Sequence, residues 1–100
     1  MKVKAKVKDG VLKVKMMIKH EMLTYDQAAR KGLKANFVTH IVAKIGDEVV
    51  YEASTSQFLS KNPIVKYKAH ADFVKKGDKI VTTVTDLSGH VEVDTSKVKI

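Results

Sequence analysis

Four histidines are the side chains in this sequence with the clearest capacity for chemistry, because imidazole is a common metal ligand and acid–base group. They are His20, His40, His70 and His90, and Met22 lies close enough to His20 in sequence to suggest copper. None has the close spacing of a recognised metal motif, and no cysteine or group of carboxylates joins them. We therefore expect no metal and no other cofactor, and interpret the histidines as residues at strand ends or in a polar interface.

The sequence also contains no recognised motif for catalysis by a nucleophile or by an acid–base pair. Ser54, Thr55, Ser56 and Ser60 supply hydroxyl groups, but no G-x-S-x-G or S-x-x-K motif surrounds them. The acidic residues include no pair that a motif would hold face to face. Without cysteine there is no thiolate nucleophile, disulfide or iron–sulfur cluster. The sequence predicts a protein that is not an enzyme.

The basic composition raises nucleic-acid binding as an alternative function. The 100-residue chain has a net charge of +8, and Arg30 is the only arginine among its 19 basic residues. Lysine rows attract phosphate, but arginine and exposed aromatic platforms are the usual readers of nucleic acids, and the aromatic residues here are scattered. A small basic β-domain that binds nucleic acid through its lysine face is therefore the alternative. The favoured interpretation is a solvated lysine face that also protects edge strands.

Alternation of apolar and polar residues predicts β-strands along most of the chain. Lysines alternate with small apolar residues over 2–8, and a second alternating run follows the Asp9-Gly10 turn over 12–18. Further strands are predicted at residues 36–45, 49–53, 63–69, 80–85 and 90–93. The apolar phase changes near Thr95, which predicts a bulge or a break there. These short strands favour an all-β, immunoglobulin-like antiparallel sandwich, or a small barrel, built as one domain over residues 1–100.

The segment from His20 to Lys34 is the one stretch that does not alternate. Thr24 and Gln27 have the spacing of a capping box, and Gly32 suits the left-handed position that follows a helix. The sequence therefore predicts a short helix over residues 25–31, within the long connection between the second and third strands.

The chain has more apolar residues than one hydrophobic core is expected to bury. The predicted third strand is apolar on both faces, since Ile41 and Ala43 share one face while Val38 and Val42 share the other. We hypothesise that this second face, the helical insert and nearby apolar residues bind a partner protein. The alternative is that the third strand is central and covered by the insert. The candidate partner-binding residues are Met17, His20, Met22, Val38, His40, Val42, Phe58 and Leu59.

Several segments, in this order and spacing, resemble the SoxZ family. They are KAKVKDGVLKVKMMIKH at 4–20, NFVTHIVAK at 36–44, SKNP at 60–63, KKGDKI at 75–80 and a V-T-D-x-x-G turn that ends at Gly89. The chain departs from the family pattern most in its insert, where many members read H-P-M-E-T-G over residues 20–25. Many members also carry tryptophan at the position of Val84.

The resemblance implies a function and a set of partners. SoxZ is a subunit of the SoxYZ sulfur carrier in the thiosulfate-oxidising Sox pathway, and it has no catalytic role. Its heterodimer partner, SoxY, carries the sulfur adduct on a Gly-Gly-Cys-Gly-Gly type arm. Sox cytochrome, hydrolase and dehydrogenase components contact this carrier transiently. Neither nucleic acid nor membrane is an expected partner.

The N-terminus and the resemblance lead to different expectations for localisation. Residues 1–10, MKVKAKVKDG, contain no continuous apolar region, so we expect neither a signal peptide nor a membrane span. By its residues alone the chain reads as cytoplasmic. The resemblance instead implies the periplasm, with export in complex with a signal-bearing partner.

Overall fold

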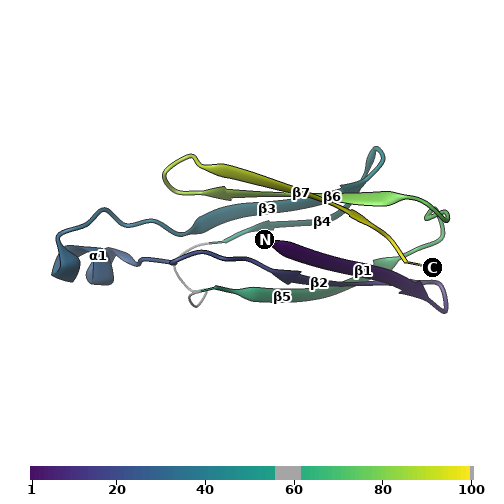
Figure 1. The fold of residues 1–100 in the computed structure, drawn as a ribbon, viewed down its shortest axis with the longest axis horizontal. Coiled ribbons are helices and arrows are strands. Elements are labelled where there is room, and N and C mark those ends of the chain that lie inside the picture. Colours follow the sequence, from purple (N-terminus) through teal and green to yellow (C-terminus); the bar gives the residue numbers. More distant parts are fainter. Residues whose placement is uncertain (56–61, 100) are drawn as a thin grey trace.

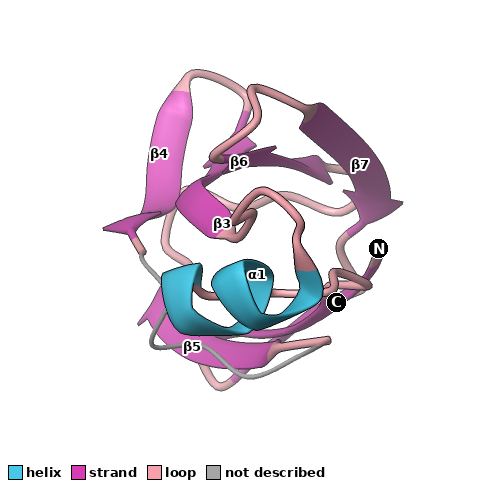
Figure 2. Cartoon of the chain, turned by 90° about the vertical axis from the view of Figure 1, so that its left-hand side faces the viewer, coloured by secondary structure: helices cyan, strands magenta, loops and turns pink. Residues whose placement is uncertain are grey.

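Two antiparallel sheets stacked face to face make up the fold in the computed structural model, which describes residues 1–55 and 62–99 (Figures 1 and 2). The three-stranded sheet has the order β1-β2-β5 and is formed by β1 (Lys2–Lys8), β2 (Val11–Met17) and β5 (Ile64–His70). The four-stranded sheet has the order β4-β3-β6-β7 and is formed by β3 (Val38–Ile45), β4 (Glu48–Ser54), β6 (Lys79–Asp86) and β7 (Val91–Lys97). The predicted antiparallel β-sandwich is confirmed.

The core lies between the inner faces of the two sheets. Leu12 and Met16 from β2 meet Ile41 from β3 and Ile80 from β6, and all four side chains are fully buried. Each strand contributes every second residue, because successive side chains of a strand point to opposite faces. Truncation of one such residue to alanine typically costs about 2–5 kcal/mol.

Different contacts close the two long sides of the sandwich. On one side the rings of Tyr51 in β4 and Tyr67 in β5 stack with centroids 4.2 Å apart. Burial, together with the neighbouring Tyr51 phenol, raises the pKa of Tyr67. On the other side the Met1 amino group donates a hydrogen bond to Glu92 Oε1 at 2.9 Å, and the backbone of Lys99 pairs with β1. The C-terminal segment thus covers the edge of β1.

Two local predictions about the strands are wrong. Alternation over the predicted strand 49–53 puts Val49, Tyr51 and Ala53 together on a core face, but the register shifts between β3 and β4 at Ala43/Lys44, and Val49 is exposed. No break occurs near Thr95, since β7 pairs regularly with β6 from Val91 to Lys97. The inner face of β7 is polar instead, and its two valines point outward.

The helical insert projects from one end of the sandwich (Figure 1). Its helix, α1 (Tyr25–Lys31), has the predicted capping box between Thr24 and Gln27, and Gly32 takes the left-handed conformation with φ of 65°. The Tyr25 ring meets Phe37 edge to face at 5.7 Å. The predicted helix is confirmed. In the part of the chain that the structure describes, no helix has the length and apolar character needed to cross a membrane.

Candidate functional site

A buried carboxylate anchors the insert to the end of the four-stranded sheet. Asp86, the last residue of β6, is 7% exposed and accepts hydrogen bonds from four groups. Oδ1 accepts from the Ser88 hydroxyl at 2.7 Å and from the His90 backbone N–H at 2.9 Å, while Oδ2 accepts from the Asn36 amide at 3.2 Å and from His20 Nε2 at 3.1 Å. We call these five residues the Asp86 network.

The Asp86 network sets the tautomer of His20 and the ionisation of the carboxylate. His20 Nδ1 accepts the Met22 backbone N–H at 2.9 Å, so Nε2 carries the proton that is donated to Asp86. Burial acts to raise the pKa of Asp86, but the hydrogen bonds from Ser88, His20, Asn36 and the His90 backbone outweigh it and lower the pKa to about 2. The carboxylate is therefore ionised at neutral pH.

The Asp86 network does not have the geometry of an activated nucleophile. A catalytic serine donates its proton to an imidazole, which a carboxylate orients from the other side. Here the Ser88 hydroxyl donates directly to Asp86, and the second nitrogen of His20 is occupied by the backbone of Met22. The network holds the ends of the insert beside the β6–β7 turn, and its role is structural.

The four histidine side chains do not gather at one site. The His20 side chain and the His90 backbone N–H both belong to the Asp86 network, whereas His40 pairs with Glu52 at 3.1 Å on the outer face of the four-stranded sheet. His70 ends β5 and His90 follows the β6–β7 turn, and both are exposed. Within residues 1–55 and 62–99, no three histidine or acidic side chains form a group that could hold a metal ion.

The outer face of the four-stranded sheet carries valine and threonine at most positions of β6 and β7, while His40, Lys44 and Glu52 lie on its β3–β4 side. Cross-strand rows run over β3, β6 and β7: Val42–Thr83–Val93, His40–Thr85–Val91 and Lys44–Val81–Thr95. Val91 and Val93 are 51% and 59% exposed. We call the apolar and threonine members of these rows the valine–threonine face.

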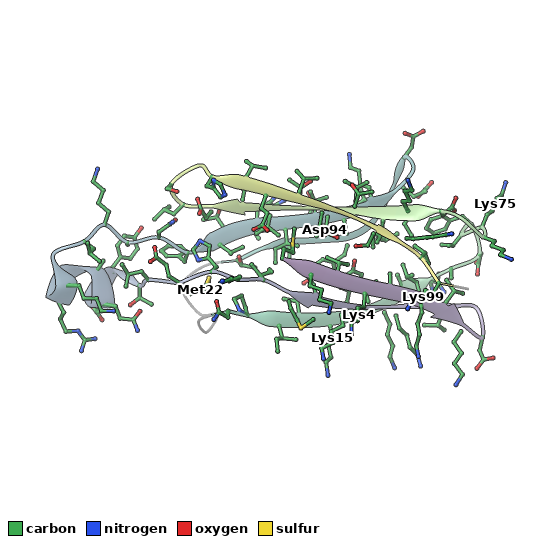
Figure 3. All side chains as sticks on the ribbon, viewed as in Figure 1. Lys4, Lys15, Met22, Lys75, Asp94 and Lys99 are labelled. Carbon is green, nitrogen blue, oxygen red and sulfur yellow. The ribbon has the colours of Figure 1, made fainter. Side chains whose placement is uncertain are left out.

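The outer face of the three-stranded sheet is dominated by lysine. Two cross-strand rows run over β1, β2 and β5, Lys4–Lys15–Lys66 and Lys6–Lys13–Lys68. All six side chains are exposed, and they line a groove of about 800 Å³ that Lys97 and Lys99 border on one side. Figure 3 shows Lys4, Lys15 and Lys99 along this sheet. We call it the lysine groove.

The predicted partner-binding residues do not form one surface. His40 and Val42 lie half-buried on the valine–threonine side, while Met17 lies half-buried on the opposite sheet between Lys2 and Ile64. His20 is held in the Asp86 network. Phe58 and Leu59 lie outside the described residues. The described residues that were predicted to form one partner-binding surface therefore lie in separate places.

Two of the predicted interface residues are buried within the chain itself. Val38 is 0% exposed, because a register shift between Val38 and His40 turns Val38 towards the core. Met22 is 3% exposed at the base of the insert, where its sulfur accepts the Val38 backbone N–H at 3.4 Å (Figure 3). The prediction that Val38 shares an outer face with Val42 is wrong.

Strands β6 and β7 contribute exposed apolar surface that was not predicted from the sequence. Val91 and Val93 alternate with polar residues, and alternation alone does not say which of the two sets faces the core. In the structure the intervening triplet Glu92, Asp94 and Ser96 lies on the half-buried inner face, so the valines point outward. Polar residues can line that face because Glu92 pairs with the N-terminal amino group and Asp94 accepts from Ser96.

Comparison with known proteins identifies the family. A search of curated proteins finds no match. The family model described as "Sulphur oxidation protein SoxZ" matches residues 1–97 of the 100-residue chain. The match spans both sheets and the insert, and it places the chain in the Sox sulfur oxidation system, among components that work with other Sox proteins. The chain belongs to the SoxZ family.

Proposed function

We propose that this chain is the non-catalytic subunit of a two-protein sulfur carrier, in which it pairs with a SoxY-like subunit whose cysteine arm holds the sulfur adduct. Family membership supports the pathway. The chain has no cysteine, so a covalently carried sulfur requires a thiol from another chain. In this proposal the carrier works in the periplasm, to which the chain is exported bound to a signal-bearing partner. Sox cytochrome, hydrolase and dehydrogenase components contact the carrier in turn.

The observation that carries the pairing is the valine–threonine face. Exposed apolar surface across several strands is unusual in a monomer and typical of a protein interface. Val42, Thr83 and Val93 form one continuous row over three strands, with no charged side chain between them. A permanent partner seated on this face would remove the valines from water, and this burial would contribute about 25 cal/mol per Å² of apolar area.

Co-expression with the SoxY-like subunit and size-exclusion chromatography test the proposal. The variant is Val42→Asp, Val93→Asp, since both side chains lie on the outer face and a charge there does not enter the core. A buried unpaired carboxylate costs several kcal/mol, so the affinity should fall at least ~100-fold, equivalent to about 3 kcal/mol. The matched control is Ile64→Asp, Phe73→Asp, which places two carboxylates at exposed apolar residues elsewhere.

The two variants give distinct outcomes. We expect the control to co-elute with the partner as the wild type does. Circular dichroism should show that the Val42→Asp, Val93→Asp variant is folded. Size-exclusion chromatography should show that this variant no longer co-elutes with the partner. A folded variant that co-elutes at unchanged affinity would contradict the assignment of this face. A wild-type chain that does not bind the SoxY-like subunit would contradict the proposed function itself.

A further inference from the structure

The two lysine rows are an arrangement that folding alone does not explain. Lys13 and Lys15 each face one lysine on β1 and another on β5, so like charges sit directly opposite one another across three strands. Such pairs destabilise a sheet. Solubility needs only net charge, and alternating acidic and basic residues would supply a solvated face without this repulsion.

Edge protection does not explain the rows either. A lysine blunts an edge strand because its charge opposes pairing with another chain. Lys13 and Lys15, however, lie on β2, which is the central strand of the three-stranded sheet. One side of β1 is already covered by the backbone of Lys99. The repulsion is therefore concentrated where protection is not needed.

No carboxylate of the described residues, 1–55 and 62–99, neutralises the lysine rows of the groove. Among the described residues, none of the six lysines of the two rows has a carboxylate within 4 Å. Neighbouring strands lie about 4.8 Å apart and alternate residues about 7 Å apart, so six backbone positions fall within a patch roughly 10 Å across. The width of this patch is comparable to the Debye length, which is about 8 Å at physiological ionic strength. Salt therefore does not screen the six charges from one another fully, and they attract an anionic surface together.

The chemistry of the groove favours an acidic protein over a nucleic acid. Arginine, whose planar group reads phosphates and bases, is absent from the groove lining. Among the described residues that line the groove, Tyr67 is the one aromatic residue, and its ring stacks on Tyr51. Lysine ammonium groups instead act as hydrated point charges, which give fast, salt-sensitive association with little geometric demand.

We propose that the lysine groove is the docking site for an acidic surface on proteins that visit the carrier transiently. This inference rests on the proposed carrier function, because only a subunit with successive clients needs a weak site beside a permanent one. The groove and the valine–threonine face lie on the outer sides of different sheets, and the two sheets stack face to face, so these surfaces are on opposite sides of the sandwich (Figure 1). A client can therefore bind while the SoxY-like partner stays in place.

The test uses the full chain in complex with its SoxY-like partner, and a roughly 20-residue polyglutamate as the acidic probe, titrated at ~10 mM and ~150 mM salt. The groove variant is Lys13→Glu, Lys15→Glu. The matched control, Lys75→Glu, Lys76→Glu, changes the net charge equally at exposed lysines of the β5–β6 turn. We expect the groove variant to bind polyglutamate at least ~10-fold more weakly than the wild type at low salt, and the control to change less than ~3-fold.

A duplex DNA of similar total charge provides the competing probe. Equal loss of polyglutamate binding in both variants would overturn the proposal, because the effect would then follow net charge. Tighter binding of the wild-type complex to DNA than to polyglutamate would assign the groove to nucleic acid instead. Co-elution with the SoxY-like subunit is measured in parallel. The groove variant should retain it, so a failure of the groove and a failure of the carrier function give different results.

Discussion

Replacement of Asp86 by asparagine should destabilise the protein at neutral pH but not at low pH. The carboxylate accepts four hydrogen bonds while it is 7% exposed, and its pKa is lowered from an ordinary 3.8 to about 2. Folding therefore favours the ionised form. Each tenfold change in the acid constant corresponds to about 1.4 kcal/mol, so ionised Asp86 contributes about 2 kcal/mol to the free energy of unfolding at pH 7.

The pH dependence follows from the direction of this pKa change. A lowered pKa in the folded state adds stability that is complete above the unfolded value of 3.8 and is lost as the pH falls through about 2. The gap between wild type and Asp86→Asn should therefore be about 2 kcal/mol at pH 7 and should close as the pH approaches 2. In thermal melts the gap at pH 7 corresponds to roughly 10 °C.

Urea unfolding followed by circular dichroism, from pH 7 down to the lowest pH at which the wild type folds, measures this gap. Asp72→Asn is the matched control, because Asp72 is exposed and its replacement should change the free energy of unfolding by less than ~0.5 kcal/mol. An Asp86→Asn variant that stays within ~0.5 kcal/mol of the wild type at pH 7 would contradict a stabilising role of the ionised carboxylate, and so would a gap of about 2 kcal/mol that persists unchanged at low pH.

Two further predictions concern the lysine rows and the insert. Lys13→Glu turns two like-charge neighbours into opposite-charge pairs, so the free energy of unfolding should rise by roughly 0.5–1 kcal/mol in low salt and less in high salt. Urea unfolding at two salt concentrations measures this gain, and a loss of stability would contradict the repulsion argument. Thr24→Ala removes the hydroxyl that accepts the Gln27 backbone N–H at 3.2 Å, and it should weaken the helix by about 1 kcal/mol. Amide hydrogen exchange should then be faster in α1 of the variant than in the wild type, while exchange in β2 stays unchanged. An α1 exchange rate equal to that of the wild type would contradict a capping role.

Most of the fold could be predicted because the signals are local. The lysine alternation in β1 and the Asp9-Gly10 turn specify a hairpin over a few residues, and the capping box with Gly32 specifies a helix from its ends. Register shifts between strands could not be predicted in this way. The shift beside Val38 depends on how β3 pairs with β6, and it reverses the direction of a side chain that alternation places outside.

For the candidate surfaces too, local features could be predicted from the sequence, whereas the arrangement of strands beside one another could not. The strands, the short helix, the absence of cysteine and the lysine-rich composition can be read from the amino-acid sequence, because each is a property of neighbouring residues or of the residues counted together. The folded structure is needed to see that Lys13 and Lys15 lie on a central strand between other lysines, and that Val42 and Val93 share one face across β6. Strand order and register join segments far apart in the chain, and alternation within one strand does not say which strand lies beside it.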